Sequence, residues 1–230
     1  MRVLVACQRG ATQLDAITLG ESRPSRPIME AVIAVAFGYL AGSVPFAFLL
    51  ARRHGVDLRR SGSGNVGAAN VLRTSGVPNA VVAMCLDVAK GAAAVLVAQR
   101  LSGGPATPVA GGLAAVIGHI YPVWIGFRGG KGVATTAGVF IVLAPIAVAI
   151  AGTVFALATW ATRYVSVGSM TAAVTLAAAV TLAVAVAAAE ASSAVAVGGV
   201  AAAIIILHRH RGNLGRLFAG TERRVGERFF

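Results

Sequence analysis

Residues 132–162 read GVATTAGVFIVLAPIAVAIAGTVFALATWAT, an apolar stretch in which no side chain is charged. A helix of about 20 such residues crosses a bilayer, so this stretch is too long for one untilted crossing. Pro145 lies near its middle, and a proline interrupts the hydrogen-bond ladder of a helix. The stretch therefore predicts a membrane protein, with two short helices or a re-entrant pair meeting at Pro145.

Similar apolar runs fill most of the remaining chain. Of its 230 residues, 57% are hydrophobic and 12% charged, whereas an ordinary soluble domain carries about 25% charged residues. This composition excludes a disordered chain, a fibrous repeat and a conventional soluble enzyme. We expect an all-α, polytopic membrane bundle of about seven helices. Besides the two halves of the quoted stretch, the predicted spans are Ile28–Ala51 (broken at Gly42 and Pro45), Asn79–Gln99, Pro108–Phe127, Val167–Ala189 and Ser193–Leu207.

Small residues dominate these runs. Because Ala, Gly and Ser let membrane helices approach closely, the composition predicts a compact bundle. The pairs Gly111-Gly112 and Gly198-Gly199 are expected at such helix contacts. The two cysteines lie in no metal-ligand or disulfide spacing, and Cys85 is expected among the small apolar residues of the core.

The two ends of the chain differ from the apolar part. Residues 1–27 are polar and basic, without the apolar centre of 7–15 residues that a secretory signal needs. We expect this extension to be disordered, or not translated at all, with Met29 as the true start. The membrane domain is predicted over residues 28–222, followed by a cytoplasmic tail at 223–230.

Basic residues set the expected orientation. Twenty Lys and Arg against eight Asp and Glu give a net charge of +12, and cations of membrane proteins concentrate in cytoplasmic loops. If the first span runs from outside to inside, nearly all cations lie inside and Arg100 outside. These positive loops suit an anionic substrate or anionic lipid headgroups. Nucleic acid is a minor alternative, because no recognisable binding module is present.

The first polar island, residues 59–73, reads RRSGSGNVGAANVLR. Its glycines form the pattern G-x-G-x-x-G: Gly62, Gly64 and Gly67. We reject a dinucleotide-binding fold because no strand precedes them. Glycines at a helix start expose backbone amides that bind anions, although the glycines alone are more typical of a flexible cytoplasmic turn. Four polar side chains accompany them and together favour phosphate binding: Ser63, Asn65, Asn70 and Arg73.

The second island is a charged pair inside a predicted span. Asp87 and Lys90 lie three residues apart, on one face of a helix. Ionisable groups within a membrane normally face the interior of the bundle and pair there. The pair either fixes helix packing by mutual neutralisation or supports a functional site, and the sequence leaves both open.

The third island, GFRGGKGVAT at residues 126–135, follows His119. It is not a P-loop, because Gly132 rather than Ser or Thr follows Lys131. Two cations among glycines before a new helix predict a second anion site, where Lys131 would neutralise a phosphate or an oxyanion. If Arg128 and Lys131 only set the orientation of the chain in the membrane, this would explain their charges but not the neighbouring glycines. His119 by itself is more typical of a hydrogen-bonded structural residue.

The fourth island, HRHRGN at residues 208–213, ends the last span. His208 and His210 point apart on a helix, which makes a metal site improbable. The arginines suit the negative end of the helix dipole, but this leaves His210 and Asn213 without a role. Carboxylates are scarce, since only Asp57 and Asp87 lie between Glu30 and Glu190. A magnesium-dependent phosphotransferase is therefore disfavoured.

These islands together resemble the bacterial membrane acyl-phosphate:glycerol-3-phosphate acyltransferases, the PlsY family. The resemblance runs from about Glu30 to Glu222. It rests on eight stretches in order: GYLAGSVP (38–45), GVDLR (55–59), GSGNVG (62–67), LDVAKG (86–91), GHIYP (118–122), GFRGGKGVAT (126–135), RYVS (163–166) and RHRGN (209–213). Two positions depart from the family pattern: Ala69 stands where Thr is usual, and Gly212 where Glu is usual.

The resemblance implies a seven-helix bundle in the bacterial plasma membrane with a cytoplasmic site. It implies transfer of a fatty acyl group from acyl phosphate to the 1-hydroxyl of glycerol 3-phosphate, giving lysophosphatidic acid and phosphate, without cofactor or metal. This is the first step of phospholipid synthesis. The implied partners are these substrates, membrane lipids and the soluble enzyme that makes acyl phosphate, but no nucleic acid.

The resemblance also assigns roles to individual residues. The implied catalytic residues are Ser63, Arg73 and Lys131. The implied substrate-binding residues are Gly62, Gly64, Asn65, Gly67, Asn70, Gly129, Gly130, His210 and Asn213. Supporting positions are Asp87, Lys90, His119 and Arg128.

Two other functions remain as alternatives. One is a catalytically weak membrane paralogue that binds lipid phosphate or scaffolds lipid synthesis. The other is a small transporter, which is disfavoured because its cations would line a path through the membrane, whereas these gather on one face.

Overall fold

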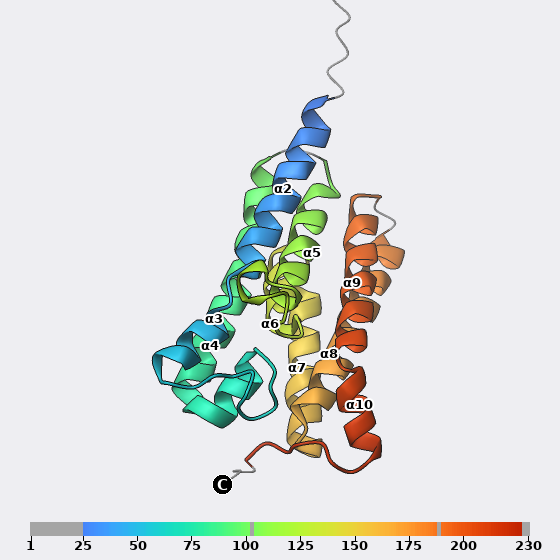
Figure 1. Cartoon of the computed structure of the whole chain (residues 1–230). Helices are drawn as coiled ribbons and strands as arrows, with labels where there is room; N and C mark the ends of the chain where they lie inside the picture. Colours follow the sequence, from blue (N-terminus) through green and yellow to red (C-terminus); the bar gives the residue numbers. More distant parts are fainter. Residues whose placement is uncertain (1–24, 102–103, 188–189, 227–230) are drawn as a thin grey trace, which may run out of the picture.

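The computed structural model describes residues 25–101, 104–187 and 190–226, and no residue in these ranges forms a β-strand (Figure 1). The predicted all-α membrane bundle is confirmed. Its elements are α2 (Ser25–Ser43), α3 (Phe46–Arg53), α4 (Ala68–Arg100), α5 (Thr107–Ile120), the 3-10 turn η1 (Val123–Ile125), α6 (Val133–Leu143), α7 (Pro145–Thr162), α8 (Val165–Ala187), α9 (Glu190–Arg209) and α10 (Arg211–Phe218).

Six segments of the described chain are long and apolar enough to cross a membrane, if α9 and α10, bent by 51°, count as one. The seventh apolar helix is α6, whose 11 residues extend only about 16 Å at 1.5 Å per residue. It is the short helix that Pro145 predicts, because α6 ends at Leu143 and α7 begins at the proline. The predicted break at Pro45 is also present, between α2 and α3.

Helix α4 differs from the prediction. The span predicted here begins at Asn79, but α4 begins at Ala68 and is broken at Gly76, which has φ +82°. A glycine tolerates this left-handed conformation, and Pro78 is tolerated because it lies in the first turn after the break. Arg73 therefore projects from a short helical segment and not from a loop. Cys85, expected in the core, is exposed on the surface of α4.

Glycines set the helix contacts at the centre of the bundle. A Cβ on Gly138 of α6 would lie 1.9 Å from the carbonyl oxygen of Val88 in α4. A Cβ on Gly38 of α2 would lie 2.1 Å from the carbonyl oxygen of Gly111 in α5. No side chain fits at either place, so the backbones of α4 and α6, and of α2 and α5, touch directly.

The two predicted glycine pairs also lie at helix contacts. A Cβ on Gly112 would meet Val139 at 2.6 Å, and one on Gly198 would meet Val109 at 2.4 Å. Around these contacts α6 is the centre of the core. Its fully buried Phe140 and Val139 belong to a cluster with residues of α4, α5, α7, α8 and α9: Val95, Val116, Ile120, Ala147, Ala151, Leu176, Val180 and Ala202.

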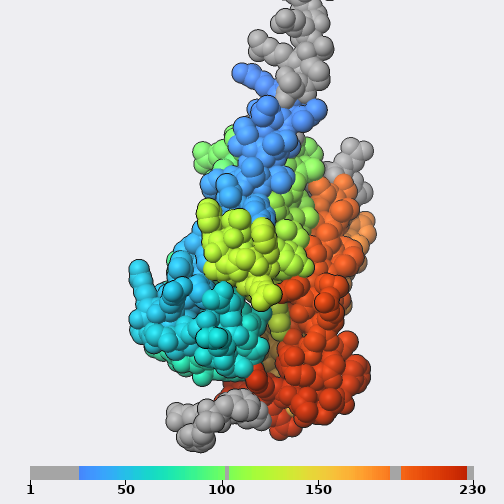
Figure 2. All heavy atoms as spheres, viewed as in Figure 1, coloured from blue at the N-terminus to red at the C-terminus, as the bar shows by residue number. Residues whose placement is uncertain are grey.

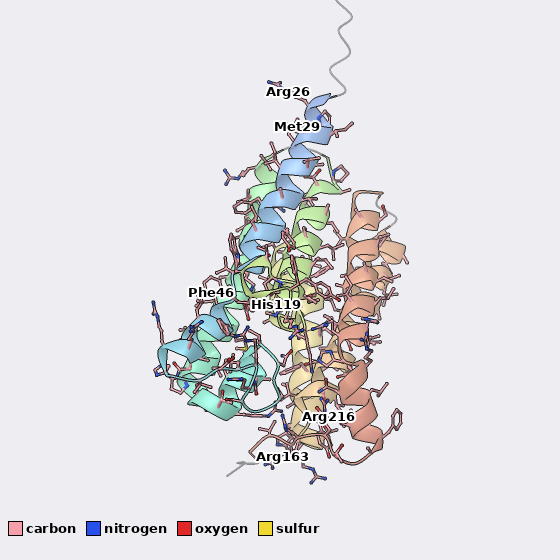
Figure 3. All side chains as sticks on the ribbon, viewed as in Figure 1. Arg26, Met29, Phe46, His119, Arg163 and Arg216 are labelled. Carbon is pink, nitrogen blue, oxygen red and sulfur yellow. The ribbon has the colours of Figure 1, made fainter. Side chains whose placement is uncertain are left out.

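The polar segments lie at one end of this bundle. Helix α3, the loop before α4, the α7–α8 turn and α10 share that end, whereas α2 begins at the other (Figure 1). Figure 3 accordingly places Arg163 and Arg216 far from Arg26 and Met29. Residues 1–24 of the predicted extension and residues 227–230 of the predicted tail lie outside the described residues. Residues 25–27 form the start of α2.

Candidate active site

The first glycine loop, residues 58–67, is held by a single buried amide. The Nδ2 of Asn70 donates to the carbonyl oxygens of Leu58 at 3.1 Å and Ser61 at 3.0 Å, and its Oδ1 accepts from the backbone N–H of Ser63 at 2.8 Å. Gly62 has φ +60°, and a Cβ there would lie 2.2 Å from Asn70 Oδ1. Asn70, expected to bind substrate, thus uses both of its side-chain polar atoms to fold the loop.

The other polar side chains of this segment differ in exposure. Ser63 is exposed, whereas Asn65 and Arg73 are half-buried. Gly64, with φ +73°, occupies a second left-handed turn, and Gly67 precedes the first residue of α4. Loop and helix start therefore form the sharp turn that the glycine pattern predicts.

The second glycine loop folds back on the end of α5. The backbone N–H of Gly129 donates to Ile120 at 3.0 Å, and that of Gly130 donates to His119 at 3.1 Å. A Cβ on Gly129 would lie 2.1 Å from the carbonyl oxygen of His119. We expected these two glycines to offer their amides to an anion. Since both amides are already donated within the protein, close packing explains the glycines instead. Arg128 is exposed at the tip of this loop.

Lys131 links this loop to the C-terminal helices. Its Nζ donates to Oδ1 of Asn213 in α10. The Nδ2 of Asn213 in turn donates to Oε1 of Glu222 at 2.5 Å. Glu222 also accepts from Ser166 Oγ at 2.8 Å and from Arg216 Nε at 2.8 Å. Three segments distant in sequence, the second loop, the start of α8 and the C-terminal stretch, therefore meet through one lysine, one amide and one carboxylate.

Glu222 is the site residue that the sequence analysis did not single out. Its carboxylate is buried, although it stands beside two arginines in a polar stretch typical of a solvated tail. The available signal was weak: it is a lone carboxylate at the end of the motif series.

His210 lies beside the same cluster, buried at the junction of α9 and α10. Its Nδ1 lies 2.8 Å from the carbonyl oxygen of Ile206. Since a carbonyl oxygen only accepts, Nδ1 carries the proton, and Nε2 of the neutral ring is left as an acceptor. The preceding residue, Arg209, donates to the carbonyl oxygen of Gly130 at 3.3 Å and lies over the ring of Tyr121.

The two glycine loops also touch each other. A Cβ on Gly130 would lie 2.9 Å from the carbonyl oxygen of Val66 in the first loop. In Figure 2 the yellow-green surface of the second loop lies against both the cyan first-loop region and the red C-terminal helices. The structure therefore brings Lys131, His210 and Asn213 together, with Arg73 near enough for its charge to act on Lys131.

The electrostatics of the cluster follow from its crowded cations. Burial, against the opposing charge of Glu222 and together with the charges of Arg216, Arg73 and Arg209, lowers the pKa of Lys131 to about 8. Burial alone would raise the pKa of Glu222, but hydrogen bonds from Asn213, Ser166 and Arg216 hold it below its ordinary value. The cluster is thus predominantly positive, with one structural carboxylate.

The charged pair of the second island lies deeper in the bundle. Lys90 Nζ lies 2.8 Å from Asp87 Oδ1 and donates to the carbonyl oxygen of Val44 at 2.9 Å, at the break between α2 and α3. His119 Nδ1 lies 3.4 Å from the same Asp87 oxygen. All three side chains are buried. The pair is therefore neutralised, and it also contacts the end of α5 on which the second loop folds.

This arrangement suits the binding of phosphate groups. Lys131 and the arginines whose charges act on it, Arg73, Arg209 and Arg216, gather cations from three segments, and charge-assisted hydrogen bonds from such cations hold phosphates well. Among the residues that the structure describes, no group of three or more His, Cys, Asp or Glu is arranged to hold a metal ion.

Comparison with known proteins gives a consistent result. A family described as "Glycerol-3-phosphate acyltransferase" matches residues 32–220. A glycerol-3-phosphate acyltransferase of Mesorhizobium japonicum is 43% identical over 196 residues, covering 85% of this chain and 96% of the relative. One from Anaeromyxobacter dehalogenans is 45% identical over 207 residues, covering 86% and 99%.

Two solved structures share the fold. Both are of PlsY, an integral membrane glycerol 3-phosphate acyltransferase. Its glycerol 3-phosphate form has a TM-score of 0.78 at 39% identity, covering 85% of this chain and 96% of that one. Its lysophosphatidic acid form has a TM-score of 0.76 at 38% identity, covering 85% and 95%. The chain therefore belongs to the PlsY family of integral membrane glycerol-3-phosphate acyltransferases, as its motif series predicts.

Proposed function

We propose that this protein transfers a fatty acyl group from acyl phosphate to the 1-hydroxyl of glycerol 3-phosphate, giving lysophosphatidic acid and inorganic phosphate. The observation that carries the proposal is the contact between Lys131 and Asn213, in a cluster where the charges of Arg216, Arg73 and Arg209 act on the lysine. Both proposed substrates are phosphate anions, and the pocket supplies the cations and amides that hold such groups.

The reaction needs little acid–base apparatus. The 1-hydroxyl oxygen attacks the acyl carbonyl carbon, the bond from that carbon to the phosphate oxygen breaks, and phosphate leaves with the electron pair. The hydroxyl proton passes to a phosphate oxygen. Acyl phosphate is a mixed anhydride with a good leaving group, so orientation and charge neutralisation supply most of the catalysis. This suits a site with many cations and one carboxylate, Glu222. That carboxylate already accepts hydrogen bonds from Ser166, Asn213 and Arg216.

The residues divide between the two phosphates. Lys131 neutralises the charge that develops on the departing phosphate, and Arg73 adds a second cation beside it. Asn213 and the free acceptor Nε2 of His210 hold glycerol 3-phosphate, His210 through a hydroxyl group. Ser63 and Asn65 belong to the loop that Asn70 shapes, and we assign them to the same reaction through that loop. The glycines of both loops allow the backbones to approach.

The proposed location is the bacterial plasma membrane, with the site facing the cytoplasm. The end of the bundle that carries the site also carries the cations of α3, the α7–α8 turn and α10, and cations favour the cytoplasmic side. A cytoplasmic site would receive its acyl phosphate from a soluble enzyme that makes this compound.

Reconstitution into vesicles tests the proposal. Purified protein receives acyl phosphate and glycerol 3-phosphate, while phosphate release and lysophosphatidic acid are measured together, and acyl-CoA replaces acyl phosphate in a parallel assay. We expect equal amounts of both products from acyl phosphate only. The Lys131→Ala variant should lose this activity, whereas Arg100→Ala, a cation removed from the other end of the bundle, should retain it. Release no faster than in Lys131→Ala would instead support a catalytically weak paralogue.

A further inference from the structure

Gly130 is enclosed on every side by groups of other segments. Its N–H donates to the carbonyl oxygen of His119, and its own carbonyl oxygen accepts from Arg209. A Cβ at this position would lie 2.1 Å from Nε2 of the His119 ring and 2.9 Å from the carbonyl oxygen of Val66. The imidazole edge is therefore the surface against which the backbone next to Lys131 packs.

The opposite edge of the His119 ring contacts a buried ion pair. Its Nδ1 lies 3.4 Å from Asp87 Oδ1, which also lies 2.8 Å from Lys90 Nζ. Lys90 neutralises the carboxylate, and the contact with Asp87 holds the ring at its Nδ1 edge. The same lysine holds Val44 at the break between α2 and α3. The network thus joins α2, α4 and α5 into one frame, at mid-height of the bundle where Figure 3 labels His119.

We propose that His119 is a positioning residue for acyl transfer: oriented by Asp87, its ring edge fixes Gly130 and thereby holds Lys131 in the pocket. The inference rests on the proposed function, but it concerns the arrangement of the loop, which can be measured without turnover. It assigns a task to the buried triad Asp87, Lys90 and His119, none of which lines the cationic cluster itself.

The Nε2 edge of the ring can be removed without removing the donor at the Nδ1 position. In His119→Asn the amide NH2 stands near the position of Nδ1, so the donor to Asp87 is kept, while the Nε2 edge facing Gly130 is lost. This variant keeps the buried charges paired, so it should fold. Gly130→Ala disturbs the same contact from the other side, because its methyl group collides with the intact ring. Gly152→Ala is the matched control, since a Cβ there meets nothing within 4 Å.

The first readout is the pKa of Lys131, measured by the pH dependence of its acylation by a small reagent, with mass spectrometry of the modified peptide. The charged or titratable groups that act on this lysine are Glu222, Arg216, Arg73, Arg209 and His210. None is changed by the variants. In the wild type we expect a pKa of about 8. Loosening of the loop lets water reach Nζ, so His119→Asn and Gly130→Ala should raise the pKa by one unit or more, and Gly152→Ala should leave it unchanged.

The second readout is the double variant His119→Asn/Gly130→Ala. If the ring and the methyl group oppose each other, removing the ring edge relieves the collision. Acyl transfer by the double variant should then exceed that of Gly130→Ala at least threefold, with incomplete recovery because Val66 still crowds the methyl group. A Lys131 pKa unchanged in both single variants, or a double variant no better than Gly130→Ala, would overturn the inference. A wild type without acyl transfer would instead refute the proposed function, and the pKa readout would still test the positioning.

Discussion

Lys131 Nζ donates a hydrogen bond to Asn213 Oδ1 across 82 positions of the sequence. The contact joins the second glycine loop to α10, and the Nδ2 of Asn213 donates a second hydrogen bond to the buried Glu222. A lysine on a glycine-rich loop would otherwise be mobile. The amide therefore determines where the positive charge of the pocket stands.

Removal of this amide should impair catalysis strongly. Asn213→Ala leaves Lys131 and Glu222 without their shared partner, and a hydrogen bond to a charged group is worth about 1.5–3 kcal/mol. This corresponds to a loss of about 10- to 100-fold in kcat/KM for glycerol 3-phosphate, measured by acyl transfer in vesicles. Leu214→Ala, the neighbouring and half-exposed position, serves as control. Equal activity of the two variants would show that the amide has no part in the reaction.

Activity should fall as the pH rises through about 8. Burial lowers the pKa of Lys131 to about 8 from its ordinary 10.5, so the cation is lost above that pH. Between these two values the unfolded chain binds more protons than the folded one, and the contribution of this lysine to stability rises with pH. The decline in activity should therefore occur without unfolding, as circular dichroism would show. In an active Lys131→Arg variant the decline should be absent, and its persistence would assign it to another group.

Glu222 should set the pH at which activity declines. In Glu222→Gln the negative charge that raises the pKa of Lys131 is removed, so the fall in activity should move to lower pH. The new NH2 group also faces the Arg216 donor or competes with Ser166 and Asn213, so the melting temperature should drop. Activity measured between pH 6 and 9 checks the direction. An upward shift would contradict the arrangement described here.

Helix packing should not tolerate a methyl group at Gly138. The Cβ of Gly138→Ala would lie 1.9 Å from a backbone oxygen of α4, which cannot move without displacing the helix. Overpacking typically costs 1–3 kcal/mol, and we expect about 3 kcal/mol here. Unfolding in detergent measures the loss, with Gly152→Ala as the control that meets nothing. Similar stabilities of the two variants would mean that α4 and α6 are further apart than described.

The departure at Ala69 should be harmless. This residue is half-buried in the first turn of α4, so a hydroxyl and a methyl group can be added towards the loop. Ala69→Thr should leave acyl transfer unchanged or raise it, because it restores the residue usual in the family. A large loss would show that the first loop of this chain is arranged differently from its counterpart in the family.

Local signals in the sequence predicted the spans well. Pro45 and Pro145 end helices through their own geometry, so their effect is visible without knowledge of the fold. The break at Gly76 was not predicted, because a single glycine is compatible with a helix as well as with a turn. The span was predicted to begin only at Asn79, because the polar residues around Arg73 are typical of a loop, although the glycine pattern already indicated a helix start.

The roles of individual site residues were harder to predict. Gly129 and Gly130 fit an anion-binding loop by pattern, but their amides are satisfied by the end of α5, a partner that only the tertiary structure supplies. Asn70 likewise turns inward to its own loop. Glu222 was missed because its burial depends on Ser166, which lies 56 residues away. Sequence motifs identified the segments that meet, whereas long-range contacts decide which atoms remain available.

The central claim is that three separate segments form one site for a phosphorylated substrate. Titration calorimetry of the purified protein with glycerol 3-phosphate tests it most directly, without any acyl donor. We predict that Arg73→Ala, Lys131→Ala and Asn213→Ala, one change in each segment, each weaken binding at least tenfold, while Arg100→Ala binds as tightly as the wild type. Unchanged affinity in any two of the three segment variants would contradict a shared pocket.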